Sequence, residues 1–130
     1  MITQYREDSL RRALETLHKI LPDALESVIV NVDSLLVTAY PASDDRDGPT
    51  GSEQVAAMAS VLMGLADRTL HRLEQGELDR VMVEGERGIL VVLPASVDAA
   101  LAVLISKEAK VGLALLQIKR CAEQIHRILR

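Results

Sequence analysis

Few side chains in this 130-residue chain could carry out chemistry, and they are widely scattered. The chain has one cysteine, Cys121, and three histidines, His18, His71 and His126. A nucleophilic cysteine needs a base within hydrogen-bond reach and a third group that orients this base. Cys121 falls instead on the buried side of a predicted helix, beside Ala122, where a free cysteine behaves as a small hydrophobic residue. These positions predict no nucleophilic site.

Metal coordination is no better supported by the sequence. Histidine ligands of a metal ion cluster, whereas these three histidines lie on separate stretches, each on the polar side of its predicted helix. Cys121 and His126 point well apart on one helix, so their spacing does not form a metal pair. Asp44, Asp45 and Asp47 could suggest a divalent cation, but no glutamate completes a calcium-loop pattern. We therefore interpret the histidines as solvated and the aspartates as part of a solvated acidic loop.

Phosphate binding is also not indicated. Gly76, Gly85 and Gly88 match neither a P-loop nor a dinucleotide fingerprint. An arginine can stimulate a nucleotide hydrolase when it is inserted beside the phosphates, but most exposed arginines only solvate a surface. We interpret four arginines in this second way: Arg68, Arg72, Arg80 and Arg87. The sequence thus predicts a protein that is not an enzyme and that uses no cofactor and no metal ion.

The composition indicates one globular domain over residues 1–130. Hydrophobic residues make up 48% of the chain and charged residues 26%, which is typical of a folded globular protein. Aromatic residues account for only 2%, and the net charge is −4. Both values disfavour nucleic acid as a partner, because its recognition relies on cationic side chains and aromatic stacking. No apolar run is long enough to span a membrane, and the N-terminal stretch is charged where a signal peptide would be apolar, so we expect a cytoplasmic protein.

The first half of the chain predicts a helix followed by a β-hairpin. The helix begins near residues 7–9, places Ile20 on its core face and stops at Pro22, since helix is disfavoured at the residue before a proline. Two β-branched, apolar runs on either side of Asp33-Ser34 predict the hairpin. Residues 42–51 are polar, acidic and rich in glycine and proline, which indicates a surface loop.

The second half predicts two helices and three strands. A long helix starts at Ser52, its expected N-cap, and closes at Gly76. Strands follow over residues 78–84, 88–94 and 99–106, and a last helix runs from about residue 107 to residue 129. The order α-β-β-α-β-β-β-α predicts an α+β fold with three helices and a five-stranded, mostly antiparallel sheet.

The first half of the long second helix has no obvious polar face, because residues 54–66 include no charged side chain. At about 100° per residue, its core-facing stripe comprises Val55, Ala59, Leu62, Ala66, Leu70 and Leu73. The opposite side carries Ala57, Ser60, Val61 and Gly64, and it becomes charged only from Asp67 onward. Two interpretations are open. The helix is either buried on every side, or it covers its own domain with one face and offers the other face to a protein.

The sequence resembles the roadblock/dynein-light-chain family, and within it the bacterial MglB-like branch. The resemblance covers roughly residues 10–128 and rests on the order and spacing of several short motifs. These are the Leu21-Pro22 helix exit, the hairpin around Asp33, the Ala/Ser/Gly-rich second helix, the Gly76-Glu77-Leu78 link and the Gly112-Leu113 opening of the third helix. The chain departs from the family at Asp33-Ser34, where the usual hairpin has Asp-Gly, and in the unusually acidic loop after Pro41.

The resemblance implies a roadblock fold, related to the profilin-like sandwiches, without chemistry of its own. It further implies a homodimer joined through edge strands into one sheet, and a small Ras-like GTPase as partner whose nucleotide cycle is regulated. We place the dimer interface at Leu65, Arg80 and Met82, and the GTPase-binding surface at Ala57, Ser60, Val61, Gly64, Arg68 and Arg72. The effect on the GTPase, namely faster hydrolysis, faster exchange or localisation, is left open, as is the face of the second helix that each partner uses.

The alternative is a small-molecule-sensing or scaffolding α/β sandwich domain without a GTPase partner. Related sandwich domains bind ligands between the sheet and the helices. The absence of Trp and Phe counts against this alternative, because ligand sites usually have aromatic walls and convergent polar groups.

Overall fold

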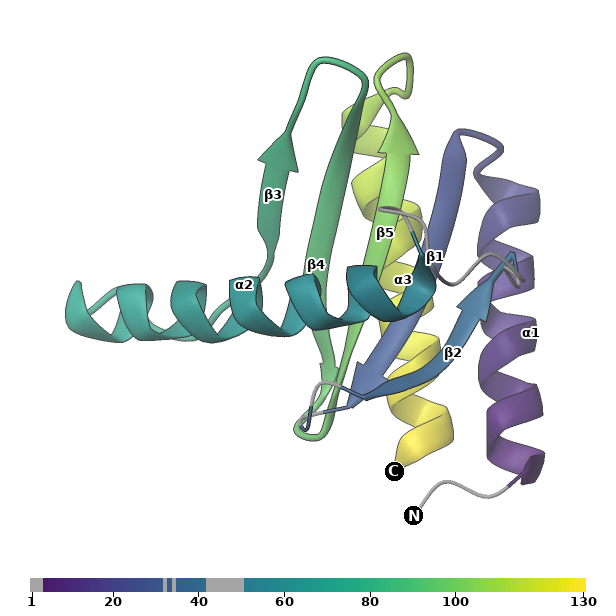
Figure 1. Ribbon diagram of the computed structural model, residues 1–130, viewed down its shortest axis with the longest axis horizontal. Helices are drawn as coiled ribbons and strands as arrows, with labels where there is room; N and C mark the ends of the chain where they lie inside the picture. Colours follow the sequence, from purple (N-terminus) through teal and green to yellow (C-terminus); the bar gives the residue numbers. More distant parts are fainter. Residues whose placement is uncertain (1–3, 32, 34, 42–50) are drawn as a thin grey trace.

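The computed structural model of the chain describes residues 4–31, 33, 35–41 and 51–130. Its elements follow the predicted order α-β-β-α-β-β-β-α (Figure 1). The helices are α1 (Gln4–Ile20), α2 (Ser52–Arg72) and α3 (Val111–Leu129), and the strands are β1 (Ala24–Asn31), β2 (Leu36–Tyr40), β3 (Val81–Glu84), β4 (Gly88–Ser96) and β5 (Ala99–Ser106).

The five strands form one antiparallel sheet in the order β2-β1-β5-β4-β3. Helix α2 crosses one face of this sheet, and α1 and α3 cover the other face (Figure 1). The predicted α+β class, the element order and the antiparallel sheet are therefore confirmed. The two edges of the sheet are β2, which lies near α1, and β3, which lies at the opposite side.

Each face of the sheet has its own core, because side chains along a strand alternate between the faces. On β1, Ile29 points toward α1 and α3, whereas Val28 and Val30 point toward α2. The core beneath α1 and α3 is large and includes fully buried aliphatic side chains such as Leu14 and Ile118. The core beneath α2 is small and consists of valine and alanine: Val28, Val30, Ala56, Ala59, Val92, Ala100 and Ala102.

Strands β1 and β2 form the predicted hairpin. Its turn is held by Asn31, whose side-chain oxygen accepts hydrogen bonds from the backbone N–H groups of Asp33 at 3.0 Å and Leu35 at 3.1 Å. The expectations for Ser34 and for residues 42–50, with their three aspartates, lie outside the described residues.

Strand β3 is shorter than the predicted strand over residues 78–84, because it begins at Val81. The reason lies on β4. Gly88 accepts the turn hydrogen bond from the N–H of Gly85 at 2.9 Å, so every second residue of β4 from Gly88 onward directs its backbone groups toward β3. Pro94 occupies one of these positions and has no N–H to donate. The chain before Val81 therefore leaves the sheet.

Both predicted ends of the second helix need correction. The N-cap is Gly51 rather than Ser52, whose hydroxyl donates instead to Oε1 of Glu26 on β1 at 3.0 Å. At the other end, the helix stops well before Gly76. The left-handed conformation that ends a helix is already adopted by Glu74, with φ 54°, although Gly76 is also left-handed with φ 89°.

The other helices differ from prediction mainly at their starts. Helix α1 begins earlier than predicted, and α3 begins later, because the N–H of Ala109 bonds to the carbonyl of Ser106 at 3.1 Å in a turn that precedes α3. Ile20 is 55% exposed and not part of the core. It is the last residue of α1, and Leu21, which is 5% exposed, takes the buried position instead.

Candidate functional site

The candidate site is built on α2, which extends well beyond the edge of the sheet at β3 (Figure 1). The buried residues of this helix, Ser52, Ala56 and Ala59, all lie in its first half. Met63 is the last residue of the helix that packs against the core beneath it. Residues 64–72, which we call the overhang of α2, therefore contribute to neither core.

Small side chains bring the first half of α2 close to the sheet. Ala56 and Ala59 are fully buried against a surface that includes Ala100 and Ala102 on β5. The predicted core-facing stripe is confirmed only over this half, where Ala59 is buried and Val55 and Leu62 pack against the core. Ala66 and Leu70 are only half-buried, and Leu73 is 62% exposed. The stripe continues in the sequence, but the sheet that would cover it ends.

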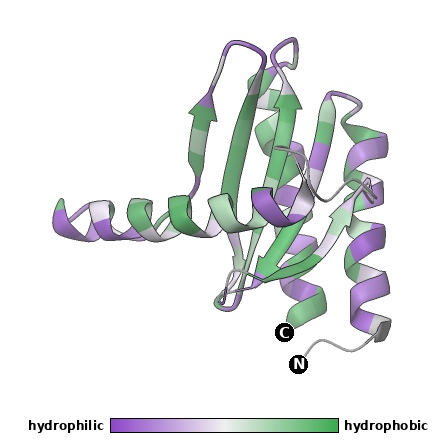
Figure 2. Ribbon diagram, viewed as in Figure 1, coloured by the Kyte–Doolittle hydropathy of each residue, from purple (hydrophilic) through white to green (hydrophobic). Residues whose placement is uncertain are grey.

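The outer side of α2 exposes three large apolar side chains. Met58 is 51% exposed, Val61 70% and Leu65 56%, and their i, i+3, i+7 spacing places them on one face of the helix. Apolar residues continue along the middle of α2 past the point where it leaves the sheet (Figure 2). Met58 was not among the predicted partner-binding residues, although its spacing from Val61 and Leu65 is that of one helix face.

The predicted partner-binding residues do not all lie on this outer side. Ala57, Val61, Arg68 and Arg72 are exposed, whereas Ser60 and Gly64 are half-buried. Ser60 and Gly64 line one wall of a hollow of about 330 Å³ between α2 and the sheet. A Cβ built on Gly64 would find Arg68 Nη1 as its nearest neighbour, at 3.7 Å, so this position has room for a side chain.

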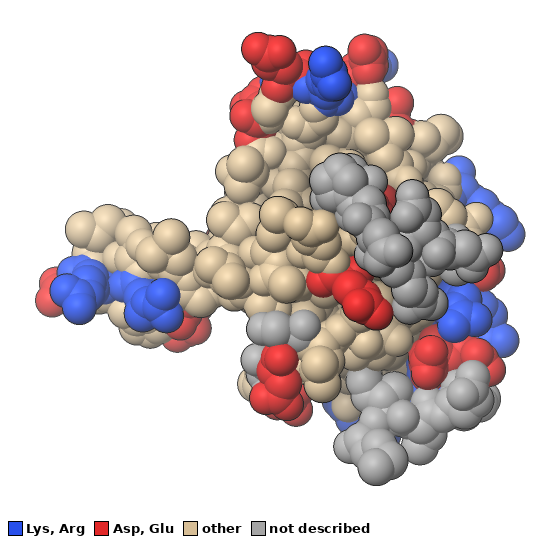
Figure 3. Space-filling model, viewed as in Figure 1, with Lys and Arg blue, Asp and Glu red and all other residues tan. Residues whose placement is uncertain are grey.

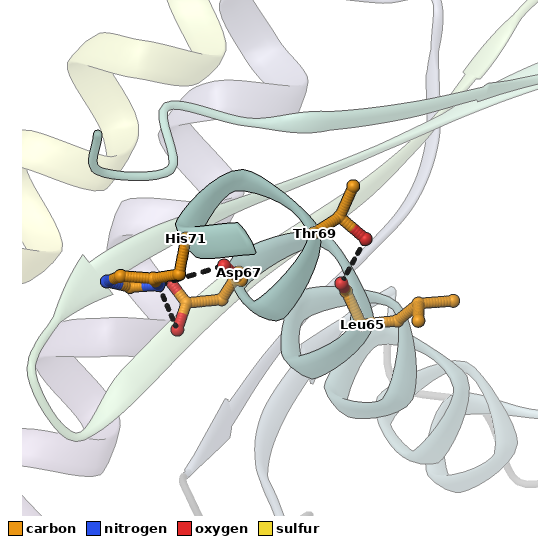
Figure 4. Close-up of polar contacts among 4 residues, drawn as sticks. All are labelled: Leu65, Asp67, Thr69 and His71. Atoms are coloured by element: carbon orange, nitrogen blue, oxygen red, sulfur yellow. Dashed lines mark hydrogen bonds and ion pairs between the residues drawn. The ribbon is translucent and has the colours of Figure 1, made fainter. Parts of the chain in front are cut away.

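The overhang presents different chemistry on its two sides (Figure 4). On one side, the Nδ1 of His71 donates to the backbone oxygen of Asp67 at 2.9 Å and lies 3.6 Å from its Oδ2. On the other side lie Leu65 and Thr69, and the hydroxyl of Thr69 donates to the backbone oxygen of Leu65 at 2.8 Å. In Figure 3, cationic side chains gather near the end of α2, with acidic atoms at its tip and on its lower side, and the upper side of the helix toward the sheet is uncharged.

Strand β3 forms an open apolar edge next to the overhang. Within the described residues it pairs with β4 alone. Met82 is 38% exposed and Val83 45% exposed. Their partners on β4 show that the two side chains point to opposite faces, since Met82 pairs with Val91 and Val83 with Leu90. Unpaired backbone groups and exposed apolar side chains along one edge are the features that favour pairing with another strand.

The thiol of Cys121 is buried, as predicted. It is 5% exposed, and its Sγ lies 3.7 Å from the backbone oxygen of Ala13 on α1. Burial raises the pKa of Cys121 to about 12, so the thiol stays protonated and is a poor nucleophile at neutral pH.

The prediction that His18 is solvated is wrong. Its Nε2 lies 2.9 Å from the hydroxyl of the fully buried Ser27, and its ring contacts the ring of Tyr40 edge-on, with centroids 4.7 Å apart. Burial lowers the pKa of His18, and a backbone hydrogen bond at Ala24 opposes this effect. The residue fills a polar position between α1 and the first two strands. Helical periodicity alone could not show that this side of α1 meets them.

Two kinds of feature are absent from the described part of the chain. Among these residues, no group of three or more histidine, cysteine, aspartate or glutamate side chains is arranged to hold a metal ion. None of the helices in the same residues combines the length and the apolar character needed to cross a membrane.

Comparison with known proteins identifies the family. A model of the Roadblock/LC7 domain matches residues 14–105. The chain belongs to the roadblock/LC7 family. This roadblock domain is 33% identical over 99 residues to the uncharacterized protein MJ1340 of Methanocaldococcus jannaschii, a match that spans 76% of this chain and 82% of that protein. The family resemblance derived from the sequence is thereby confirmed.

Solved structures show the same fold. The gliding protein MglB from Thermus thermophilus superposes on this roadblock domain with a TM-score of 0.84 at 18% identity, over 98% of this chain and 93% of MglB. A Roadblock/LC7 domain from Streptomyces avermitilis gives a TM-score of 0.79 at 23% identity, over 88% and 92% of the two chains. The predicted roadblock fold, including its likeness to MglB, is confirmed.

Proposed function

We propose that this roadblock domain is a non-catalytic, dimeric interaction protein that binds a small Ras-like GTPase and regulates its nucleotide cycle. The observation that carries the proposal is the overhang of α2 beside the open edge of β3. A helix that leaves its own sheet with apolar side chains exposed needs another surface to cover them. The family resemblance indicates which surfaces these are: a second copy and a GTPase.

A second copy would pair its β3 with this β3 and continue the sheet across both chains. Exposed Met82 and Val83 would then be covered, and the overhang of each α2 would lie over the sheet of the other copy. The predicted dimer-interface residues Leu65 and Arg80 would border this contact. Strand addition supplies backbone hydrogen bonds, and the apolar side chains supply buried area, which together suit a stable dimer.

The GTPase would bind the outer side of α2 that remains. Ala57, Ser60, Val61 and Gly64 permit a close approach, and Arg68 and Arg72 form a cationic rim. Met58 extends the same exposed face toward the start of the helix. The roadblock domain would act by positioning the GTPase's own catalytic groups, because the α2 surface offers shape and charge rather than a nucleophile and base.

Two variants separate the two contacts. Gly64→Arg should weaken GTPase binding by about 2 kcal/mol or more, roughly thirtyfold, because a long cation then occupies the centre of the surface. The dimer should persist, since Gly64 has room for a side chain. Met82→Asp should instead produce monomers, because a carboxylate would be buried at the edge contact.

The measurements are light scattering for the oligomeric state and calorimetric titration with a small Ras-like GTPase. Leu113→Asp, a change on α3 at a side chain that is 55% exposed and lies away from both contacts, serves as the matched control. Normal GTPase binding by Gly64→Arg would disprove the assignment of the GTPase-binding surface to α2. A monomeric wild-type chain at high concentration would disprove the proposed dimer. Hydrolysis and exchange assays with the same GTPase then show whether the domain accelerates GTP hydrolysis, accelerates nucleotide exchange or only localises the GTPase.

A further inference from the structure

A second open feature lies on the face of the sheet opposite α2, between α3 and the β3 side. Helix α3 packs on β4 and β5 but, among the described residues, not on β3. This arrangement leaves a groove with a volume of about 530 Å³. Its accessible apolar walls come from Leu78, Pro94 and Leu115, above the buried Val91 and Ile118.

The rim of this groove carries four exposed cationic side chains. Arg80 comes from the segment before β3, and Lys119, Arg127 and Arg130 follow one side of α3 at i, i+8 and i+11 spacing. None of the four forms an ion pair with an acidic side chain of the described residues. Two carboxylates, those of Asp79 and Glu123, also line the groove. The groove is therefore cationic although the chain as a whole carries a net charge of −4.

We propose that this groove binds an acidic amphipathic segment of a partner protein. Apolar side chains of the segment would contact Leu78, Pro94 and Leu115, while its carboxylates would meet Lys119 and Arg127. The concave shape and apolar walls fit a peptide, whereas an anionic membrane surface is recognised by a flat or protruding basic patch. All residues that line the groove belong to one chain. Arg80 on its rim also belongs to the predicted dimer interface, whereas Lys119 and Arg127 on α3 belong to neither of the two proposed contacts.

A synthetic peptide with Leu and Glu at helical i, i+3, i+4 spacing tests the proposal, with fluorescence anisotropy on the full chain as the readout. Two further peptides of the same length carry Gln or Lys in place of Glu. The acidic peptide should bind saturably and more weakly as salt rises, and the other two should bind less tightly. Lys119→Glu combined with Arg127→Glu should raise its Kd about tenfold or more, because two exposed charge contacts become repulsive.

The matched control combines Arg87→Glu with Arg120→Glu, which changes the net charge equally but alters no side chain that lines the groove. Its affinity should equal that of the wild type. Lys119→Gln with Arg127→Gln should give an intermediate Kd, and circular dichroism verifies that each variant is folded. Three outcomes would overturn the proposal: equal binding of the Gln peptide, no effect of the Lys119 and Arg127 changes, or binding to phosphatidylserine vesicles without binding to the peptide.

Discussion

The two faces of the sheet are covered in different ways. Beneath α1 and α3, long aliphatic side chains such as Leu10, Leu14 and Ile118 interlock and are fully excluded from solvent. Beneath α2, the contact depends on Ala56 and Ala59, and only the first half of the helix takes part.

This difference separates stability from interaction within one small domain. Buried aliphatic area is the main favourable term in folding, so the α1/α3 face should supply most of the free energy of unfolding. The α2 face uses small residues to hold a helix close to the sheet, and it leaves larger apolar residues such as Val61 and Leu65 outside. Four predictions test how far this division holds.

The largest effect is expected from a cavity in the α1/α3 core. Ile118→Ala should lower the free energy of unfolding by about 3 kcal/mol, because Ile118 is fully buried and its truncation leaves a cavity in the core. Leu113→Ala, on the same helix at a side chain that is 55% exposed, should change it by less than about 0.5 kcal/mol. Urea unfolding of the two variants measures both values, and equal losses would contradict the assignment of stability to this core.

A smaller effect is expected beneath α2. Ala59→Leu should lower the free energy of unfolding by about 1–3 kcal/mol, since a larger side chain forces the helix away from β5. Ala57→Leu places the same side chain on the exposed side of the helix and should leave the monomer's stability nearly unchanged. If Ala59→Leu destabilised the chain more than Ile118→Ala, the α2 contact would be the principal core and the comparison would be reversed.

His18, which lies between α1 and the first two strands, should make the stability of the domain depend on pH. Burial keeps the pKa of His18 below the value of 6.5 that it has when unfolded, so the unfolded chain takes up this proton first as pH falls. Stability from this group is therefore present above pH 6.5 and is lost as pH falls toward the folded pKa. His18→Gln should flatten the decline in the free energy of unfolding between pH 7.5 and about 5.5, as followed by urea unfolding. An unchanged decline would mean that other groups cause it.

The smallest effect concerns the ion pair between Lys107, which follows β5, and Glu84 at the end of β3. Lys107 Nζ lies 2.8 Å from Oε1 of Glu84, and both side chains are largely exposed. The hydrogen bond and the charge of Lys107 lower the pKa of Glu84. Lys107→Met should return that pKa toward its ordinary value in an NMR titration without a measurable change in the urea midpoint, because exposed pairs contribute little. A lower midpoint would show that this ion pair anchors the β3 edge.

Much of the fold follows from local patterns. The alternation in the strands and the apolar periodicity of α3 placed the elements in order, and Cys121 was correctly predicted to be buried. The ends of elements were less predictable, because they depend on partners. Ser52 bonds to Glu26 on a distant strand instead of capping its own helix. His18 hydrogen-bonds to the buried hydroxyl of Ser27 on β1.

The sequence by itself determined that α2 has apolar residues on both sides, since hydrophobic spacing along a helix is a property of the chain. Only the tertiary structure decided which of them are covered. The sheet ends at β3, and Pro94 shortens that strand by removing a backbone donor that the segment before Val81 would need. Leu70 is only half-buried and Leu73 is exposed for this reason, although Ala59 on the same stripe is fully buried. Burial depends on what lies opposite a residue in space, and periodicity along the chain does not specify where a neighbouring sheet stops.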